Sequence, residues 1–215
     1  MPDSLQVSSL QLGPLQANCF LVIQGQEGLV VDPGDEAGVV VEAMGRFDVR
    51  PAAVLVTHGH FDHIGGVAAL ASHYAVPVFA GAADAEDIAQ GGFSSMAGYE
   101  IDSVGSVHTI DGEQELALPV AVTAIPTPGH SRGSFTFSVG GELFCGDLLF
   151  RGSIGRSDLP GGDMDQLLNS IGDLMRRFPP DTVVHCGHGP DTSLGRELAV
   201  NPFLGSLRHD PNHRW

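Results

Sequence analysis

The stretch that decides the fold of this chain is Thr57-His58-Gly59-His60-Phe61-Asp62-His63. It follows the apolar run Ala53-Val54-Leu55-Val56, which is typical of a buried strand, and it precedes a helical pattern over residues 65–74. The cluster is therefore expected on a tight loop between the carboxyl end of a strand and the amino end of a helix. Open α/β sheets usually place their ligand sites at such loops.

Strands and helices alternate on both sides of this cluster. Before it, the patterns predict strands over residues 5–12, 19–23 and 28–32 and a helix over 35–46; after it, they predict a strand over 76–80 and a short helix over 82–89. The second half predicts strands over 120–125, 134–139 and 142–145, a helix over 164–178, a strand over 182–185 and a short helix over 193–200. We predict a single domain over residues 1–215, with two similar halves packed sheet to sheet and helices outside.

Composition limits the partners that this chain can have. Of its 215 residues 42% are hydrophobic, yet no apolar run approaches the roughly 20 residues of a membrane-spanning helix. The first residues lack a signal-peptide pattern, so we expect a cytoplasmic protein. The formal net charge of −16 argues against nucleic acid as a partner. Three scattered cysteines imply no disulfide framework.

The cluster contains the ligand types that zinc, iron or manganese prefer. Four such side chains within six positions cannot easily surround one ion, so we expect two pairs over two adjacent ions: His58 with His60, and Asp62 with His63. Further ligands stand at predicted strand ends, each after a glycine: His130, Asp147 and His188. A carboxylate has two oxygens, so Asp147 could bridge two ions about 3.5–4 Å apart.

The remaining histidines are read as structural or surface residues. His185 alternates with His188 in strand phase and is expected to face away from the site. Isolated histidines are usually satisfied surface or core residues, and we read four others in this way: His73, His108, His209 and His213.

The heptapeptide resembles the HxHxDH signature of the metallo-β-lactamase superfamily, and four later or earlier motifs fall in the order of that superfamily: Asp32-Pro33-Gly34, Pro128-Gly129-His130, Gly146-Asp147 and Gly187-His188-Gly189-Pro190. Residues 150–158 and 201–204 look like those of short bacterial glyoxalase II-like hydrolases. The resemblance implies an α/β fold, a four-layer αββα sandwich. It also implies one metal on His58, His60 and His130, a second metal on Asp62, His63 and His188, and Asp147 between them.

Two departures from the family pattern affect the substrate. His130-Ser131-Arg132-Gly133 replaces the commoner His-Thr-Pro-Gly, which could bring Arg132 to the rim of the site. Larger glyoxalase II enzymes add a helical C-terminal domain that helps to bind glutathione, and only 27 residues follow His188 here. We therefore expect no such domain, which leaves the carrier thiol open.

The resemblance and the ligand set together predict a glyoxalase II-type metal-dependent hydrolase that cleaves a small-molecule thioester such as S-lactoylglutathione. Two divalent ions, zinc first among the candidates, lower the pKa of a bound water towards about 7, and Asp62 and Asp147 are the catalytic carboxylates. A thiol leaving group has a pKa near 8.5 and needs little protonation. Asp32 either orients a ligand imidazole or only forms a turn. Arg156 either binds a substrate carboxylate or is a surface residue.

Other readings remain open from the sequence. A persulfide dioxygenase with a single iron and a lactonase belong to the same superfamily, whereas a β-lactamase is less favoured because its common dizinc form uses a Cys ligand. A nuclease is disfavoured by the charge, and a non-catalytic metal-binding scaffold by the intact ligand set. The sequence also leaves open the acyl group, the native metal and its occupancy, and the oligomeric state. The role of residues 81–112 is open as well: they form either a wall of the site or a solvated excursion.

Overall fold

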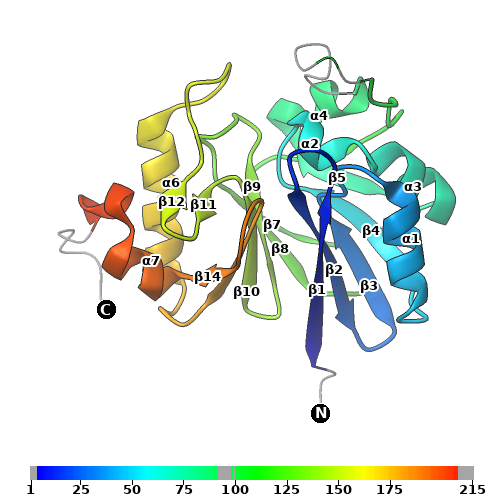
Figure 1. The fold of residues 1–215 in the computed structure, drawn as a ribbon, viewed down its shortest axis with the longest axis horizontal. Helices are drawn as coiled ribbons and strands as arrows, with labels where there is room; N and C mark the ends of the chain where they lie inside the picture. Colours follow the sequence, from blue (N-terminus) through cyan, green and yellow to red (C-terminus); the bar gives the residue numbers. More distant parts are fainter. Residues whose placement is uncertain (1–3, 92–97, 99, 208–215) are drawn as a thin grey trace.

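The computed structural model describes residues 4–91, 98 and 100–207, and Figure 1 shows its arrangement. The predictions for His209, His213 and the tail up to Trp215 lie outside the described residues.

The first sheet has the strand order β1-β2-β3-β4-β5-β6. Its first three strands are antiparallel, and β3 to β6 run parallel. Parallel neighbours need crossover connections, and these are supplied by helices. The bounds of the strands and of the helices that cover them are β1 (Leu5–Leu12), β2 (Ala17–Gln24), β3 (Glu27–Val31), α1 (Ala37–Gly45), β4 (Pro51–Val56), α2 (Phe61–Ile64), α3 (Val67–Tyr74), β5 (Val78–Gly81), α4 (Ala82–Ala89) and β6 (His108–Ile110).

The second sheet has the order β14-β13-β10-β9-β8-β7. Its strands are antiparallel except for the parallel pair β10 and β13, between which α6 forms the crossover. A separate small hairpin, β11 with β12, follows β10 in the chain. The bounds are β7 (Gln114–Leu116), β8 (Val122–Pro126), β9 (Phe135–Val139), β10 (Glu142–Gly146), β11 (Leu149–Phe150), β12 (Ser153–Ile154), α6 (Met164–Arg177), β13 (Val183–Cys186), β14 (Thr192–Ser193), α7 (Leu194–Val200) and η1 (Pro202–Leu204).

The two sheets face each other, with α1, α3 and α4 outside the first sheet and α6 and α7 outside the second (Figure 1). The strand β2 shows why the layers form, because its side chains alternate between two cores. Phe20 and Val22 pack between the sheets with residues of the second sheet such as Phe137. Leu21 and Ile23 belong to the core beneath the outer helices. The predicted αββα sandwich is thereby confirmed.

The elements around the cluster differ from the prediction in one respect. A helix was expected from residue 65, but the short helix α2 already begins at Phe61, so Asp62 and His63 are helical. Gly65 and Gly66 then separate α2 from α3, where Gly65 packs closely against the backbone of Gly34. The helix over 82–89 is confirmed, whereas the short strands β6, β7, β11, β12 and β14 were not predicted. In the part of the chain that the structure describes, every helix is too short or too polar to cross a membrane.

Candidate metal centre

The predicted ligands meet at the carboxyl ends of four strands. The segment after β4 carries the histidine-rich cluster, and the segments after β8, β10 and β13 carry His130, Asp147 and His188. Three groups of possible ligand atoms result, and within each group the atoms lie within 4.8 Å of one another. One of them, Asp32 with His58 and His63, shares its histidines with the other two, which match the predicted ligand sets. The first group is His58, His60 and His130, and the second is Asp62, His63 and His188.

Asp147 lies between the two groups. Its Oδ1 is 3.4 Å from His63 Nε2, and its Oδ2 is 3.6 Å from His130 Nε2 and 3.7 Å from His188 Nε2. One carboxylate therefore contacts a histidine of each group. This is the placement that a bridging ligand between two ions requires.

Hydrogen bonds determine which nitrogen of each buried imidazole is free. Thr57 Oγ1 donates its single proton to Asp32, so His58 Nδ1, 3.0 Å away, must donate to that hydroxyl. His63 Nδ1 donates to Asp32 Oδ2 at 3.0 Å, and His130 Nδ1 donates to the carbonyl of Arg156 at 2.8 Å. In all three residues Nε2 is thus left to act as a ligand atom.

Divalent ions fit this donor set. His58 Nε2, His63 Nε2 and Asp147 Oδ1 are buried without a hydrogen-bond partner among the described residues. An unpaired buried polar atom costs about 1–3 kcal/mol, and coordination to a metal ion would remove that cost. His130 Nε2 also lies 2.8 Å from His60 Nδ1, so these two ring nitrogens converge. Nitrogen and carboxylate donors in this number suit zinc, iron or manganese.

In the first group, the surroundings of His58 and His60 lower the pKa of both imidazoles. Burial, together with the neighbouring histidines, lowers the pKa of His58 well below its ordinary value. Burial and the nearby His130 lower the pKa of His60 to about 4. A metal ion therefore does not have to displace protons from His58 and His60 in order to bind there.

The second group is organised around ionised carboxylates. Burial opposes the ionisation of Asp62, but the hydrogen bond from His188 and the charge of His63 outweigh it and lower its pKa to about 2. Burial likewise opposes ionisation of Asp147, but the charge of His63, whose Nε2 lies 3.4 Å from Asp147 Oδ1, outweighs burial and lowers its pKa. For His63, burial is outweighed by Asp147 and Asp32, so its pKa is raised. The hydrogen bond to Asp62 raises the pKa of His188.

Asp32 accepts a hydrogen bond from the proposed ligand His63, and neither of its carboxylate oxygens lacks a hydrogen-bond partner. Its Oδ1 accepts from Thr57 N at 2.7 Å, while its Oδ2 accepts from Thr57 Oγ1 at 2.6 Å and from His63 Nδ1 at 3.0 Å. Both carboxylate oxygens are thus engaged. Of the two readings of the Asp32-Pro33-Gly34 motif, this geometry favours the orienting role. Gly34 is needed as well, because a Cβ at this position would lie 1.8 Å from the carbonyl oxygen of Asp62.

The metal centre opens into a cavity of about 370 Å³. Its floor consists of proposed ligands, and its walls are apolar except for Arg156; the wall residues are Leu15, Phe61, Arg156, Leu159 and Pro160. The wall residue Leu15, in the turn between β1 and β2, was missed by the sequence reading. The signal available in the sequence was a leucine directly after the turn-forming pair Gly13-Pro14.

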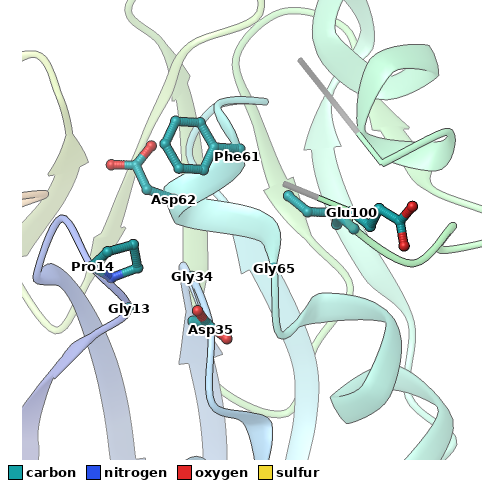
Figure 2. A pocket seen from close by; sticks show the side chains of 9 residues that line it. Gly13, Pro14, Gly34, Asp35, Phe61, Asp62, Gly65 and Glu100 are labelled. Carbon is teal, nitrogen blue, oxygen red and sulfur yellow. The ribbon is translucent and has the colours of Figure 1, made fainter. Parts of the chain in front are cut away.

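A smaller cavity of about 70 Å³ lies on the other side of Phe61 and Asp62. Figure 2 shows Pro14 of the β1–β2 turn facing α2, with Gly34 and Asp35 below. Gly13, Gly65, Glu100 and Ile101 complete its lining. The segment 81–112 therefore reaches this small cavity, whereas the walls of the larger one come from 15, 61 and 156–160.

The two predicted substrate-binding arginines differ in position. Arg156 lines the larger cavity, and its exposed guanidinium pairs with Asp158 through two hydrogen bonds of 2.7 Å. Arg132 is exposed and lines a separate cavity with Asp84, Pro160 and Gly161. Neither role is decided by this geometry.

The other histidines that the structure describes, His73, His108 and His185, lie apart from the two ligand groups. His73 and His108 are exposed. His185 is buried and faces away from the centre, as its strand phase predicted. Its Nε2 lies 2.7 Å from Glu142 and its Nδ1 lies 3.0 Å from Asp191.

Comparison with known proteins agrees with this geometry. The family model of the metallo-beta-lactamase superfamily matches residues 12–188. The hydroxyacylglutathione hydrolase GloC of Haemophilus influenzae is 29% identical over 94% of this chain and 99% of its own length. The crystal structure of the BLEG-1 B3 metallo-beta-lactamase is 36% identical with a TM-score of 0.87, and covers 93% of this chain and 100% of its own. That of TTHA1623 in a di-iron-bound form is 39% identical with a TM-score of 0.84, and covers 92% and 100%.

The family match extends over most of the chain, and it includes all seven residues that converge on the centre. The two solved structures share the whole fold as well as more than a third of the sequence. The chain therefore belongs to the metallo-β-lactamase superfamily, a superfamily of metal-dependent hydrolases.

Proposed function

We propose that this protein is a metal-dependent hydrolase of glyoxalase II type, which cleaves a thioester such as S-lactoylglutathione. The observation that carries the proposal is the convergence of two ligand groups on Asp147, at the floor of a cavity with apolar walls. The likeness to the hydroxyacylglutathione hydrolase GloC supports the thioester as substrate.

His58, His60 and His130 would hold one ion, Asp62, His63 and His188 would hold the other, and Asp147 would contact both. When bound, the two ions supply Lewis acidity, which polarises a carbonyl group and makes water more acidic. The two carboxylates bring two negative charges to a site whose ions bring four positive ones. The remaining positive charge favours an acyl group whose oxygen becomes negative during the reaction.

The side chains around the centre position the substrate and exclude water. Leu15, Phe61, Leu159 and Pro160 offer apolar surface on which the acyl group and the carbon chain of the thiol can pack. Among the described lining residues, the titratable side chains are the proposed ligands and Arg156. These described lining residues thus include no tyrosine, lysine or cysteine that could protonate a leaving group. A thiolate leaving group needs little protonation, so a thioester suits this site better than an amide.

Arg156 is the one cationic wall residue, and we propose that it binds the carboxylate of the substrate. Its guanidinium already pairs with Asp158 on the surface. Exposed pairs of this kind are worth only about 0–1 kcal/mol, so a substrate carboxylate can compete for the arginine. Arg132 remains a proposal for the rim of the site.

The test is metal content and turnover of S-lactoylglutathione in the same sample. We expect two metal ions per chain and rapid hydrolysis. Asp147→Asn removes the charge of the bridging carboxylate, so it should lower both the metal content and kcat/KM, the latter by about 100-fold or more. The exposed Asp181→Asn serves as control and should resemble wild type. An Asp147→Asn protein with wild-type occupancy and rate would refute the bridging role.

β-Lactam hydrolysis is the second candidate, because BLEG-1 shares 36% of the sequence and the complete fold. A cephalosporin assayed in the same sample separates the two activities. Faster turnover of the β-lactam than of the thioester would favour this candidate. A single iron, oxygen consumption with a persulfide and no hydrolysis would instead favour the dioxygenase reading.

A further inference from the structure

Asp84 occupies an unusual position on α4. It is a carboxylate in the first turn of that helix and is only 6% exposed, although it belongs to neither ligand group. Burial of a carboxylate is costly unless hydrogen bonds compensate for lost water. The partners of its two oxygens therefore indicate why the residue is there.

The partners come from the two segments that carry the three histidines of the first group. Asp84 Oδ2 accepts from Gly59 N at 2.9 Å, and Gly59 stands between His58 and His60. The same oxygen accepts from Ser131 Oγ at 2.6 Å, and Ser131 directly follows His130.

The second carboxylate oxygen of Asp84 binds the segment that follows His130. Asp84 Oδ1 accepts from Gly133 N at 2.8 Å. A Cβ at Gly133 would lie 2.5 Å from the backbone nitrogen of Asp84, so this close approach requires glycine. Ser131 Oγ also lies 2.7 Å from Ser134 Oγ, which holds the loop in a compact form.

This network explains the departure from the common His-Thr-Pro-Gly pattern. Ser131 retains the hydroxyl that donates to Asp84, and Gly133 retains the small residue. The intervening Arg132 is exposed, so proline is not needed there. Ser131 and Gly133, which contact Asp84, thus have the properties of the Thr and Gly in the His-Thr-Pro-Gly pattern.

We propose that Asp84 is a positioning residue for the three-histidine site: it joins the segment of His58 and His60 to the segment of His130. Charge-assisted hydrogen bonds of this kind are about twice as strong as neutral ones. None of the hydrogen bonds of Asp84 described above involves Asp62, His63 or His188. The proposal therefore predicts a selective effect on one metal site.

The test compares Asp84→Asn in two backgrounds. His188→Ala leaves the three-histidine group intact, and His130→Ala leaves the Asp62, His63 and His188 group intact. Zinc affinity of each metal-free protein is measured by competition with a chromophoric chelator. An asparagine cannot accept from both Gly59 N and Gly133 N, so one amide loses its partner.

We expect Asp84→Asn to weaken zinc binding about 10–100-fold in the His188→Ala background. In the His130→Ala background the affinity should change by no more than about twofold. Glu86→Gln, an exposed substitution on the same helix, is the matched control and should leave both affinities unchanged. Equal losses in both backgrounds would assign Asp84 a general structural role and overturn the proposal. The proposal would also be overturned if Asp84→Asn caused no loss of affinity in either background. It would equally be overturned if the His188→Ala protein, with Asp84 intact, bound no zinc.

If Asp84→Asn does not fold, Ser131→Ala removes the hydrogen bonds of this hydroxyl to Asp84 and Ser134. It should weaken zinc binding about two- to tenfold, again only in the His188→Ala background. The inference shares one assumption with the proposed function, namely that the three histidines are metal ligands. Zinc binding is measured without substrate, so a protein that fails to hydrolyse thioesters but shows the selective loss would disprove the proposed function alone.

Discussion

At the scale of single residues, Asp32 combines backbone strain with a demanding hydrogen-bond role. Its φ of 49° is left-handed, which costs a non-glycine residue about 1–3 kcal/mol. The conformation turns the carboxylate towards Thr57 and His63, where it accepts three hydrogen bonds. It thereby determines the free nitrogen of His63 directly and that of His58 through the hydroxyl of Thr57.

Asp32→Asn should therefore weaken metal binding without unfolding the protein. The amide can accept on only one side, so either His63 or Thr57 loses its partner. We expect a loss of about 10–100-fold in zinc affinity, measured by chelator competition. Asp48→Asn is the matched control, since Asp48 is also left-handed, with a φ of 54°, but is exposed. Unchanged affinity in Asp32→Asn would reduce Asp32 to a turn residue.

At the scale of elements, α7 and η1 hold the β11–β12 hairpin beside the centre. Glu197, fully buried on α7, accepts from Gly152 N at 2.7 Å. Asn201 donates to Ser153 O and to Glu197 Oε2, both at 2.9 Å. The hairpin leads directly into Arg156, whose carbonyl orients His130. The late Asn201-Pro202-Phe203-Leu204 motif is thus linked to the metal centre through one hairpin.

Asn201→Ala should loosen that hairpin. The substitution leaves Ser153 O and part of Glu197 unpaired, so we expect a loss of about 1–3 kcal/mol in the free energy of unfolding, measured in urea. Amide hydrogen exchange should become faster over residues 149–156 before it does so in β10 or β13. Asn169→Ala, on the exposed face of α6, is the control. If amide hydrogen exchange became faster to the same extent over the whole chain, Asn201 would not stabilise the β11–β12 hairpin locally.

At the scale of the whole molecule, the two sheets meet through an apolar core that includes one charged group at its edge. His185 of β13 stacks on Phe144 with ring centroids 4.5 Å apart and contacts Phe20 of the first sheet at 5.2 Å. Burial opposes its protonation, but the carboxylates of Asp191, 3.0 Å from Nδ1, and Glu142, 2.7 Å from Nε2, outweigh burial and raise its pKa. The two carboxylates beside the ring therefore favour the protonated form of His185 where the sheets meet.

This arrangement makes stability depend on pH in a defined direction. A histidine whose pKa is raised in the folded state stabilises fully below its unfolded value of about 6.5, and the stabilisation disappears as the pH rises through the folded value. The free energy of unfolding of wild type minus that of His185→Gln should thus be larger at pH 6 than at pH 9. The exposed His73→Gln provides the baseline for losing one histidine. A difference that grows with pH would show that His185 is buried in its neutral form.

Much of the fold followed from local patterns. The apolar stripe of α6 and the apolar run of β2 are properties of neighbouring residues, and both predicted elements formed. The strands β11, β12 and β14 were missed because each has only two residues, too few for a period to show. The single-domain organisation over residues 1–215 stays a prediction.

By itself the sequence determined the composition of the candidate centre: the side-chain types, their spacing within His58–His63, and the glycines before His130, Asp147 and His188. These depend on residue identity and short-range geometry. Only the tertiary structure decided which ring nitrogens are free, that Leu15 lines the cavity, and that Asp84 joins two ligand segments. The reason is physical. Those contacts link residues that stand far apart in the chain, and no local preference specifies them until the two sheets pack and bring the ends of four strands together.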